Sequence, residues 1–530
     1  MDSRASSAEP RPTVWTTDSP AVAETLPLAP APSLLDEVLA ATSSKTARPA
    51  TPGRLDQFLH EKSLIDALHL WLGSLEELRG PDARRKLSQR LARDVATLDR
   101  CLSDQTNAVL HHPKFQKLEA SWRGLQYLVE QVPAGENIKV RVLSVSWAEL
   151  ARDAERALEF DQSQLFRKVY SEEFGTPGGE PFSLLLGDYE VRHRLSADHP
   201  IDDLSLLDSI SHVAAGAFAP FIAGAHPSLL DLTSFTELEK PLDLARTFEQ
   251  IEYLKWKSLR NHEDARFVGL VLPRVLMRLP YDDQTSRIDG FNFREEVHAA
   301  DRQGYLWGSP VYAFGAVVVR AFGDSGWPAA IRGVVRGETT GGLVTGLTTH
   351  DFNTDKPGIA PKCLTDGIVT DAQEKELSDL GLIPLCHLQD AGMLAFYSNQ
   401  SIQQPRQYDE TAATVNARIS SMLQYMLCIS RFAHYLKVIS RDKVGAFAGA
   451  TECEDHLRRW LSNYVNSSEN ASAQLKARHP LREAKVQIRE IPDRPGSYRC
   501  VAHLRPHFQL DQMVTSVRLV TELTPGRRGA

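Results

Sequence analysis

The sequence lacks the features that mark a membrane protein or a disulfide-rich protein. It has six cysteines in 530 residues and no CxxC pair, so neither a zinc site nor a disulfide framework is expected. Its longest uncharged apolar stretch, residues 213–225, is shorter than the roughly 20 residues that a membrane span needs. The first residues include Asp2, Arg4 and Glu9 and lack the apolar core of a secretory signal. These absences predict a soluble cytoplasmic protein that does not insert directly into a membrane.

The sequence also lacks an excess of charge of one sign. It has 60 basic and 68 acidic residues, which gives a net charge of -8. Proteins that bind nucleic acid usually carry a basic excess, so no nucleic-acid partner is expected. A chain of 530 residues is too long for one ordinary core, so two or three folding units are predicted.

No constellation of residues in the sequence points to catalysis. The glycines of residues 333–346 have no lysine among them, so they lack the charge of a phosphate-binding loop. Residues 323–326 spell Gly-Asp-Ser-Gly, the local signature of a trypsin-like nucleophile, but that chemistry also needs a histidine base and a buried aspartate on an all-β fold. A turn is therefore predicted here, and a serine hydrolase using Ser325 is kept only as a remote alternative. Adjacent residues on a helix point about 100° apart and rarely bind one metal, so a helix end with polar caps is predicted at His111 and His112. No enzyme, metal or cofactor is predicted.

The N-terminal region combines a tail with one short amphipathic element. Residues 1–32 are rich in Pro, Ala, Ser and Thr and are predicted to be disordered. A helix is predicted over residues 33–41, followed by a polar linker to residue 53. Four apolar residues share one face of it: Leu34, Leu35, Val38 and Leu39. So short a stripe has no core of its own, and two interpretations remain open: a nascent helix, or a peptide that docks in a groove of a partner.

The rest of the chain predicts a multi-domain protein of the mixed α/β class. Residues 54–110 read as helical, with apolar residues spaced for one buried face. A mixed α/β domain is expected over residues 111–400, and a C-terminal domain over residues 401–530. The predicted elements of the α/β domain are strands at 138–145, 182–186 and 267–272, a helix at 204–218, and a strand pair at 382–388 and 393–397. The predicted elements of the C-terminal domain are one long helix at 409–443 and strands at 486–491, 498–505 and 514–522.

Seven strings along the chain together resemble one family, the large subunit of the type VI secretion contractile sheath (TssC/VipB). They occur in the order of that family and cover roughly residues 105 to 525. The strings are HHPKFQKLEASWRGL at 111–125, LLLGDY at 184–189, APFIA at 219–223, YLWG at 305–308, ELSDLG at 376–381, SRFAHYLK at 430–437 and LRPHFQL at 504–510.

The resemblance implies a structural protein of the Gram-negative cytoplasm. Members of the family pair with a small sheath subunit and polymerise with further copies of themselves into a helical sheath around an inner tube of haemolysin-coregulated protein (Hcp). The sheath is built on a baseplate and contracts to drive the tube and its spike into a neighbouring cell. The long tail and the helical region 54–110 depart from the family pattern. A non-polymerising paralogue, accessory to the machine or associated with its baseplate, therefore remains the alternative.

The resemblance also implies two sets of functional residues. In the family, an N-terminal helix is captured by the AAA+ ATPase ClpV after contraction. This favours a docking role for Leu34, Leu35, Val38 and Leu39. C-terminal strands of neighbouring subunits interlace into shared sheets, which would leave no free strand edge. The residues that this implies for inter-subunit strands are Val486, Ile488, Val501, Leu504, Val514, Val517 and Leu519.

Overall fold

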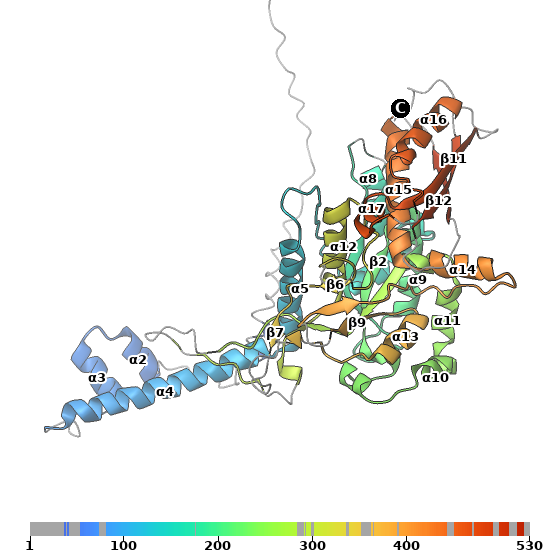
Figure 1. Cartoon of the computed structure of the whole chain (residues 1–530). Coiled ribbons are helices and arrows are strands. Elements are labelled where there is room, and N and C mark those ends of the chain that lie inside the picture. Colours follow the sequence, from blue (N-terminus) through green and yellow to red (C-terminus); the bar gives the residue numbers. More distant parts are fainter. Residues whose placement is uncertain are drawn as a thin grey trace, which may run out of the picture.

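The computed structural model has a central α/β body, a helical arm and a C-terminal unit (Figure 1). It describes residues 37–38, 40–41, 53–73, 81–174, 176, 178–282, 291, 293–297, 302–334, 339–350, 362–363, 365–388, 392–442, 450–468, 471–490, 498–507 and 517–523. Within these ranges, no helix combines the length and the apolar character that a membrane crossing requires.

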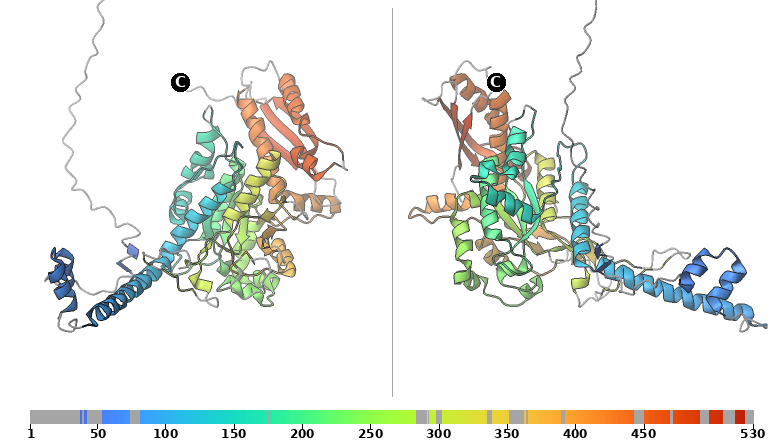
Figure 2. Two further views of the ribbon diagram at one scale, coloured as in Figure 1. Left: turned by 60° about the vertical axis from the view of Figure 1, so that its left-hand side comes forward. Right: turned by 180° about the vertical axis from the view of Figure 1, so that it is seen from behind.

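The arm consists of helices α2 (Arg54–His60), α3 (Leu64–Leu72) and α4 (Ala83–Leu110). α4 forms its shaft, and α2 and α3 lie at the far end (Figure 2). Ser63 caps α3 by accepting a hydrogen bond from the Asp66 N–H at 3.4 Å. The Trp71 indole Nε1 of α3 donates to Asp94 Oδ2 of α4 at 3.0 Å, which ties the far end to the shaft.

The described residues of the arm form no buried apolar core, so the prediction of one buried face is wrong for the isolated chain. None of the described residues in 53–73 and 81–106 is buried. Large aliphatic side chains of the arm are exposed by 43% to 79%: Leu55, Leu59, Leu64, Ile65, Leu91, Val95, Leu98 and Leu102. The predicted spacing is present, but no described residue covers the face that it creates.

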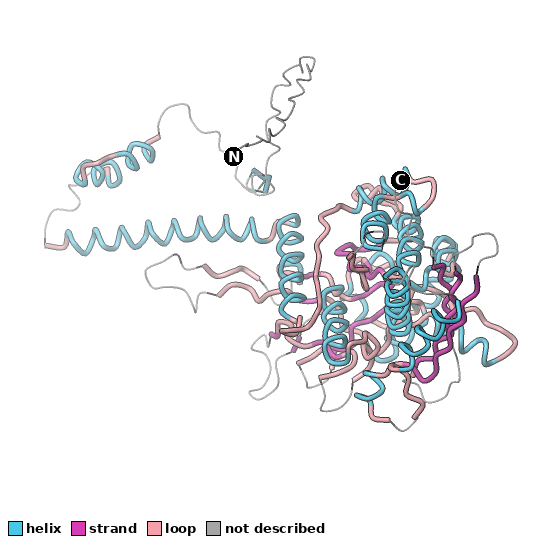
Figure 3. The backbone as a smooth tube through the Cα atoms, turned by 90° about the horizontal axis from the view of Figure 1, so that it is seen from above, coloured by secondary structure: helices cyan, strands magenta, loops and turns pink. Residues whose placement is uncertain are grey.

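A sharp turn at His111 and His112 separates the arm from the body (Figure 3). Pro113 begins helix α5 (Pro113–Glu130), where its missing N–H costs no hydrogen bond. α5 packs closely against α12 (Val311–Ser325) of the body. A Cβ atom at Gly124 would lie 2.2 Å from a ring carbon of Tyr312, so this approach requires glycine.

A six-stranded sheet forms the centre of the body, in the order β1, β2, β3, β9, β10, β6. The first four strands are parallel, while β10 runs antiparallel to both β9 and β6. Its strands are β1 (Leu185–Val191), β2 (Phe221–Ala225), β3 (Val268–Leu272), β9 (Ile383–His387), β10 (Leu394–Phe396) and β6 (Leu343–Val344). The predicted strand at 267–272 and the predicted pair at 382–388 and 393–397 are confirmed. The strand predicted at 182–186 begins only at Leu185.

Helices cover both faces of this sheet, as the apolar, fully buried strands β2 and β3 at its centre require. Leu270 and Leu272 face a core formed with α6, α9, α10, α11 and α13. Val271, between them, faces the second core with α5 and α12. The helices are α6 (Trp147–Arg156), α9 (Asp203–Ala217), α10 (Leu244–Glu249), α11 (Leu254–Asn261) and α13 (Asp371–Asp379). α9 confirms the helix predicted at 204–218.

Short elements complete the body. The helical turns are η2 (Phe160–Gln162), α7 (Gln164–Phe166), η3 (Arg167–Ser171), α8 (Glu172–Phe174), η4 (Pro227–Leu230), η5 (Phe235–Glu239), η6 (Ile251–Tyr253), η7 (Asp264–Phe267) and η9 (Arg302–Gly304). Two two-stranded pairs are β4 (Val275–Leu276) with β5 (Trp307–Gly308), and β7 (Thr349–His350) with β8 (Lys362–Cys363). The strand predicted at 138–145 is wrong, because this segment is irregular and pairs with none of the described strands.

The C-terminal unit begins with two helices where the sequence predicts one. α14 (Thr411–Ser420) and α15 (Leu423–Asp442) are separated at Ser421 and Met422. A neighbouring segment competes for the backbone there: Ser401 N–H donates to Ser421 O, and Leu423 N–H donates to Asn399 O, both at 2.9 Å. These bonds replace helical ones, so the prediction of a single helix is wrong.

The unit continues with α16 (Ala450–Ser462), α17 (Ala473–Arg478) and a three-stranded antiparallel sheet. Its strands are β11 (Leu481–Glu490), β12 (Tyr498–Pro506) and β13 (Val517–Leu523), in that order. The predicted strands at 486–491, 498–505 and 514–522 are present with shifted ends. The inner face of β11 and β12 packs on α15 and α16 in a third core.

Candidate assembly surfaces

The C-terminal sheet contains the residues predicted to link subunits. Val486, Ile488 and Leu504 are buried on its inner face, against helices of the same chain. Val501 lies on the opposite face, in register with Gln487, and is half-buried. Val517 and Leu519 belong to β13, and Val514 lies outside the described residues. The buried side chains are committed to their own core, so a neighbouring subunit would meet this sheet through strand edges. That contact stays a prediction.

The two edges of this sheet differ. β12 lies in the middle, so β11 and β13 form the edges within one chain. On β11, the Ile488 N–H donates to Glu454 Oε2 of α16 at 3.1 Å. A side chain of the same chain thus satisfies a backbone donor that an incoming strand would otherwise use. This hydrogen bond caps the outer edge of β11 at Ile488.

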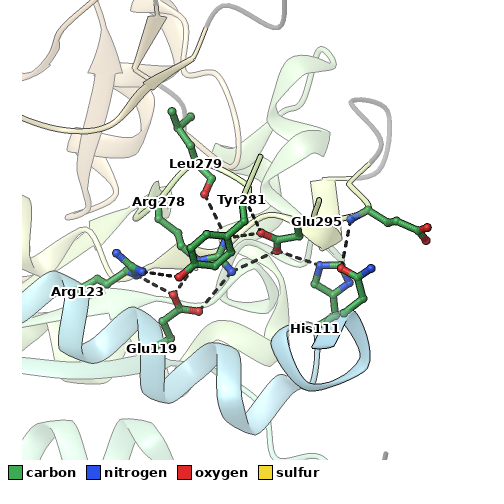
Figure 4. Close-up of polar contacts among 9 residues, drawn as sticks. His111, Glu119, Arg123, Arg278, Leu279, Tyr281 and Glu295 are labelled. Carbon is green, nitrogen blue, oxygen red and sulfur yellow. Dashed lines mark hydrogen bonds and ion pairs between the residues drawn. The ribbon is translucent and has the colours of Figure 1, made fainter. Parts of the chain in front are cut away.

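A charged network fixes the turn between the arm and the body (Figure 4). At its centre, Arg278 Nη1 donates to Glu295 Oε2 at 2.6 Å, and Arg278 Nε donates to Glu119 Oε1 at 2.7 Å. Glu295 also lies 3.1 Å from His111 Nε2, at the end of α4. The side chains of Arg278 and Glu295 are 7% and 1% exposed. The network therefore joins α4 and α5 to the segment that follows β4.

Further contacts make this network well satisfied. Arg123 Nε donates to Glu119 Oε1 at 2.8 Å, and the Tyr281 N–H donates to Glu295 Oε2 at 3.0 Å. Asn107 accepts from the Glu296 N–H at 3.2 Å. Burial alone would raise the pKa of Glu295, but hydrogen bonds from Arg278 and from the Tyr281 backbone lower it below its ordinary value. The buried carboxylate is thus held in its charged form.

This network explains part of the string at 111–125. His111, Glu119 and Arg123 belong to that string and are the α4–α5 half of the network. The sequence predicted only a helix end at His111. It gave no signal for Arg278 and Glu295, because these partners lie 159 and 184 residues from Glu119 and His111, respectively.

The string at 430–437 fills the junction between α15 and the body. His434 is buried and its Nε2–H donates to Ala217 O at 2.9 Å. Burial lowers the pKa of His434 to about 3. The ammonium of Lys437 lies 4.7 Å from the ring centre of Phe218 and 5.1 Å from that of Tyr170. Burial lowers the pKa of Lys437 to about 8.

The predicted docking helix is described only in part. Leu34, Leu35 and Leu39 lie outside the described residues, while residues 37–38 and 40–41 are helical. Val38 is fully buried, and Glu37 forms an ion pair with Lys114 in the first turn of α5. The described part of this helix thus lies beside the turn that the charged network fixes. Its docking role stays a prediction.

Ser325, the serine of the Gly-Asp-Ser-Gly string, lies at the C-terminal end of α12. Ser325 Oγ lies 2.8 Å from Ala321 O and 2.9 Å from Trp327 O, and Gly326 closes the helix with a φ of 79°. This is the hydrogen bonding of a helix end followed by a turn. Within the described part of the chain, no group of three or more His, Cys, Asp or Glu side chains is arranged to hold a metal ion.

Comparison with known proteins places this architecture in a family. Residues 92–403 match the family described as EvpB/VC_A0108, tail sheath N-terminal domain, and residues 412–523 match its tail sheath gpW/gp25-like domain. The type VI secretion system sheath protein TssC1 of Pseudomonas aeruginosa is 41% identical over 432 residues, which is 81% of this chain and 85% of that protein. A solved structure of the anti-feeding prophage helical sheath in the contracted state covers 59% of this chain and 66% of its own, at 12% identity and a TM-score of 0.28, too low to support an argument. The chain therefore belongs to the EvpB/VC_A0108 (TssC/VipB) family of type VI secretion tail sheath proteins.

Proposed function

We propose that this chain is the large structural subunit of a contractile sheath, built in the cytoplasm of a Gram-negative bacterium. It pairs with a small sheath subunit, polymerises around an Hcp tube on a baseplate, and contracts to propel tube and spike. The observation that carries the proposal is the 41% identity to a type VI sheath protein over 81% of the chain, together with matches to both sheath domains.

The C-terminal sheet supports a role in polymerisation. Its inner side chains are buried in their own core, while β13 forms an edge strand within one chain. An edge strand can pair with a strand of a neighbour through backbone hydrogen bonds. In this proposal, β11, β12 and β13 form part of an interlaced sheet. The chain divides at residues 53, 110 and 400 into the tail, the arm, the body and the C-terminal unit that forms the lattice.

The N-terminal helix would serve recycling of the contracted sheath by ClpV. Its apolar face suits a groove on the ATPase, because burying one leucine contributes about 1.5–3 kcal/mol. We expect Leu35→Asp to leave assembly with the small subunit intact and to abolish binding to the N-terminal domain of ClpV, measured by pull-down with contracted sheaths. Ser33→Ala is the matched control, because it leaves the four apolar residues unchanged. Undiminished binding of Leu35→Asp would contradict this part of the proposal.

The alternative is an accessory paralogue that binds the machine without polymerising. It is kept because the arm departs from the family pattern, and the tail sheath match begins at residue 92, within α4. The two functions differ in one property, the size of the complex formed with the small subunit. Ultracentrifugation of the co-expressed pair separates them: sedimenting polymers support the sheath function, and a complex that stays in the supernatant supports the alternative.

A further inference from the structure

Aspartate and histidine side chains alternate where α9 meets the end of α11. The two helices lie side by side in the body (Figure 1). Asp208 and His212 are one turn apart on α9. His262 is the residue that caps the C-terminus of α11, and Asp264 begins η7. Since η7 leads directly into β3, these four side chains connect α9 with the segment between α11 and a central strand of the sheet.

His212 lies between two carboxylates that belong to different elements. Its Nδ1 is 2.7 Å from Oδ2 of Asp264, and its Nε2 is 3.9 Å from Oδ2 of Asp208. A neutral imidazole has one N–H and one lone pair, so it can donate to only one of these carboxylates. The lone pair of its other nitrogen would then face the second carboxylate. An imidazolium carries a hydrogen on both nitrogens, so this geometry favours the protonated form.

A second histidine extends the arrangement. His262 Nδ1 lies 2.7 Å from Oδ1 of Asp208, so the Asp208 carboxylate lies between two imidazoles. When both histidines are protonated, two positive charges alternate with two negative charges. When both are neutral, the carboxylates of Asp208 and Asp264 have no opposite charge within this group. The attraction between the segments that carry these side chains therefore depends on bound protons.

The surroundings of His212 act in the same direction. The hydrogen bond with Asp264 raises the pKa of His212 above its ordinary value of 6.5, and the negative charges of Asp208 and Asp264 add to this, while burial opposes it. The stabilisation is therefore complete below pH 6.5 and is lost as the pH rises through the raised pKa. The four side chains are 32% to 45% exposed, so protons reach them without unfolding, and screening by solvent keeps the effect moderate.

The other charged groups of η7 and of the residue before it are paired with each other. Arg266 lies 3.6 Å from the carboxylate of Glu263, and its Nε donates to Glu263 O at 2.7 Å. This pair therefore offers neither a competing cation to Asp264 nor a further anion to His212.

The groups on the other side of His212 come from α6 and η2. The Phe160 ring centre lies 6.0 Å from that of His212, and Asp153 and Glu159 line the same cavity as His212. The Asp153 carboxylate already accepts two backbone hydrogen bonds, both at 3.0 Å, from residues 164 and 165. Contact with a carboxylate at either nitrogen of His212 thus comes from Asp208 and Asp264.

We propose that Asp208, His212, His262 and Asp264 form a proton-dependent clamp that fixes the segment between α11 and β3 to α9. The clamp is closed when His212 is protonated, because the imidazolium then faces both carboxylates with a donor. It loosens when His212 releases its proton to solvent, because one carboxylate then loses its donor. The inference rests on these contacts and is independent of the proposed function.

Hydrogen exchange of the full chain at pH 6 and pH 8 tests the clamp. After correction for the intrinsic pH dependence of amide exchange, the amides of residues 262–267 should open about threefold more often at pH 8, as expected from the loss of exposed ion pairs. His212→Gln should remove this difference, because glutamine keeps a donor and does not titrate. His60→Gln, on the exposed end of α2, is the matched control and should leave the difference unchanged. Equal opening at both pH values in the parent chain, or the full difference in His212→Gln, overturns the inference.

The pKa of His212 provides a second readout that does not depend on the size of the opening. Exchange of the imidazole C2 hydrogen, followed by mass spectrometry, reports the pKa of a single histidine in the full chain. We expect a pKa of His212 above 6.5 in the parent chain and a lower one in Asp264→Asn, because the amide carries no negative charge. A parent value at or below 6.5, or a value that Asp264→Asn leaves unchanged, contradicts the clamp.

Discussion

Single buried charged residues connect segments that lie far apart in the sequence of this chain. Arg278 is the clearest case, because it faces Glu119 on α5 and Glu295 beyond β4 at the same time. A buried ion pair is weak evidence for net stability, since desolvation offsets much of the attraction. Removing one partner of the pair is costly, however, because the remaining charges stay buried and have lost the opposite charge. The network therefore acts mainly by fixing one geometry of the arm.

We expect Arg278→Met to lower the free energy of unfolding by about 3–5 kcal/mol, because Glu119 and Glu295 would lose the charge between them. Urea unfolding of the full chain at pH 7.5 measures the change. Arg194→Met is the matched control: Arg194 pairs with Glu252 on the surface, and its loss should cost at most about 1 kcal/mol. Equal effects of the two substitutions would contradict the account of the network.

His434 makes stability depend on pH. Its pKa is about 3 in the folded chain, against the ordinary value of 6.5, because burial disfavours the charged form. As the pH falls, the unfolded chain therefore takes up the proton first. The contribution of neutral His434 to the free energy of unfolding is complete above pH 6.5 and is lost as the pH falls toward 3. Between pH 6.5 and 5 the loss is about 2 kcal/mol.

His434→Gln should remove that part of the pH dependence while keeping a donor for Ala217 O. His226 remains in the variant, with a pKa lowered to about 4 by burial, so a smaller slope should persist. Unfolding at pH 6.5 and pH 5 of both proteins measures the two slopes. An unchanged slope in the variant would show that His434 is not the group responsible.

At the scale of elements, prediction from sequence succeeded where the residues that determine an element lie within one stretch of sequence. β3 and the β9–β10 pair were predictable, because buried apolar runs and a turn lie within one stretch of sequence. The break between α14 and α15 was not, because Asn399 and Ser401 compete for that backbone from about 20 residues away. The face predicted to be buried in the arm is covered by no described residue, and the segment predicted as a strand at 138–145 pairs with no described strand.

The candidate surfaces were predictable to a similar degree. Sequence located the strands that carry Val486, Ile488 and Leu504, but not the direction of these side chains toward α15 and α16. That direction depends on register and on helix packing, which periodicity alone does not fix. The partnership of Arg278 with Glu119 was equally out of reach, since no local pattern links residues so far apart.

We expect Val517→Pro to prevent polymerisation if β13 pairs with a neighbour on the side away from β12. Proline removes a backbone donor and is excluded from the interior of a strand that is paired on both sides, except at a bulge. Val517→Thr keeps the β-branched shape and should assemble normally. Both variants are compared by pelleting with the small subunit, and normal sheaths from the proline variant would contradict the interlaced strand.

At the scale of the whole molecule, the arm and the C-terminal unit extend to opposite sides of the α/β body (Figure 1). The arm exposes aliphatic residues without a core, and the C-terminal sheet ends in an edge strand. Surfaces of both kinds are stabilised by other chains rather than by their own. The molecule thus has the character of one part of a larger assembly.

Electron microscopy of this chain co-expressed with its small sheath subunit tests the central claim most directly. The account predicts hollow tubules with a cogwheel cross-section in negative stain, formed by the pair and absent for either chain alone. A heterodimer that stays soluble at high concentration, or no complex at all, would contradict the sheath function.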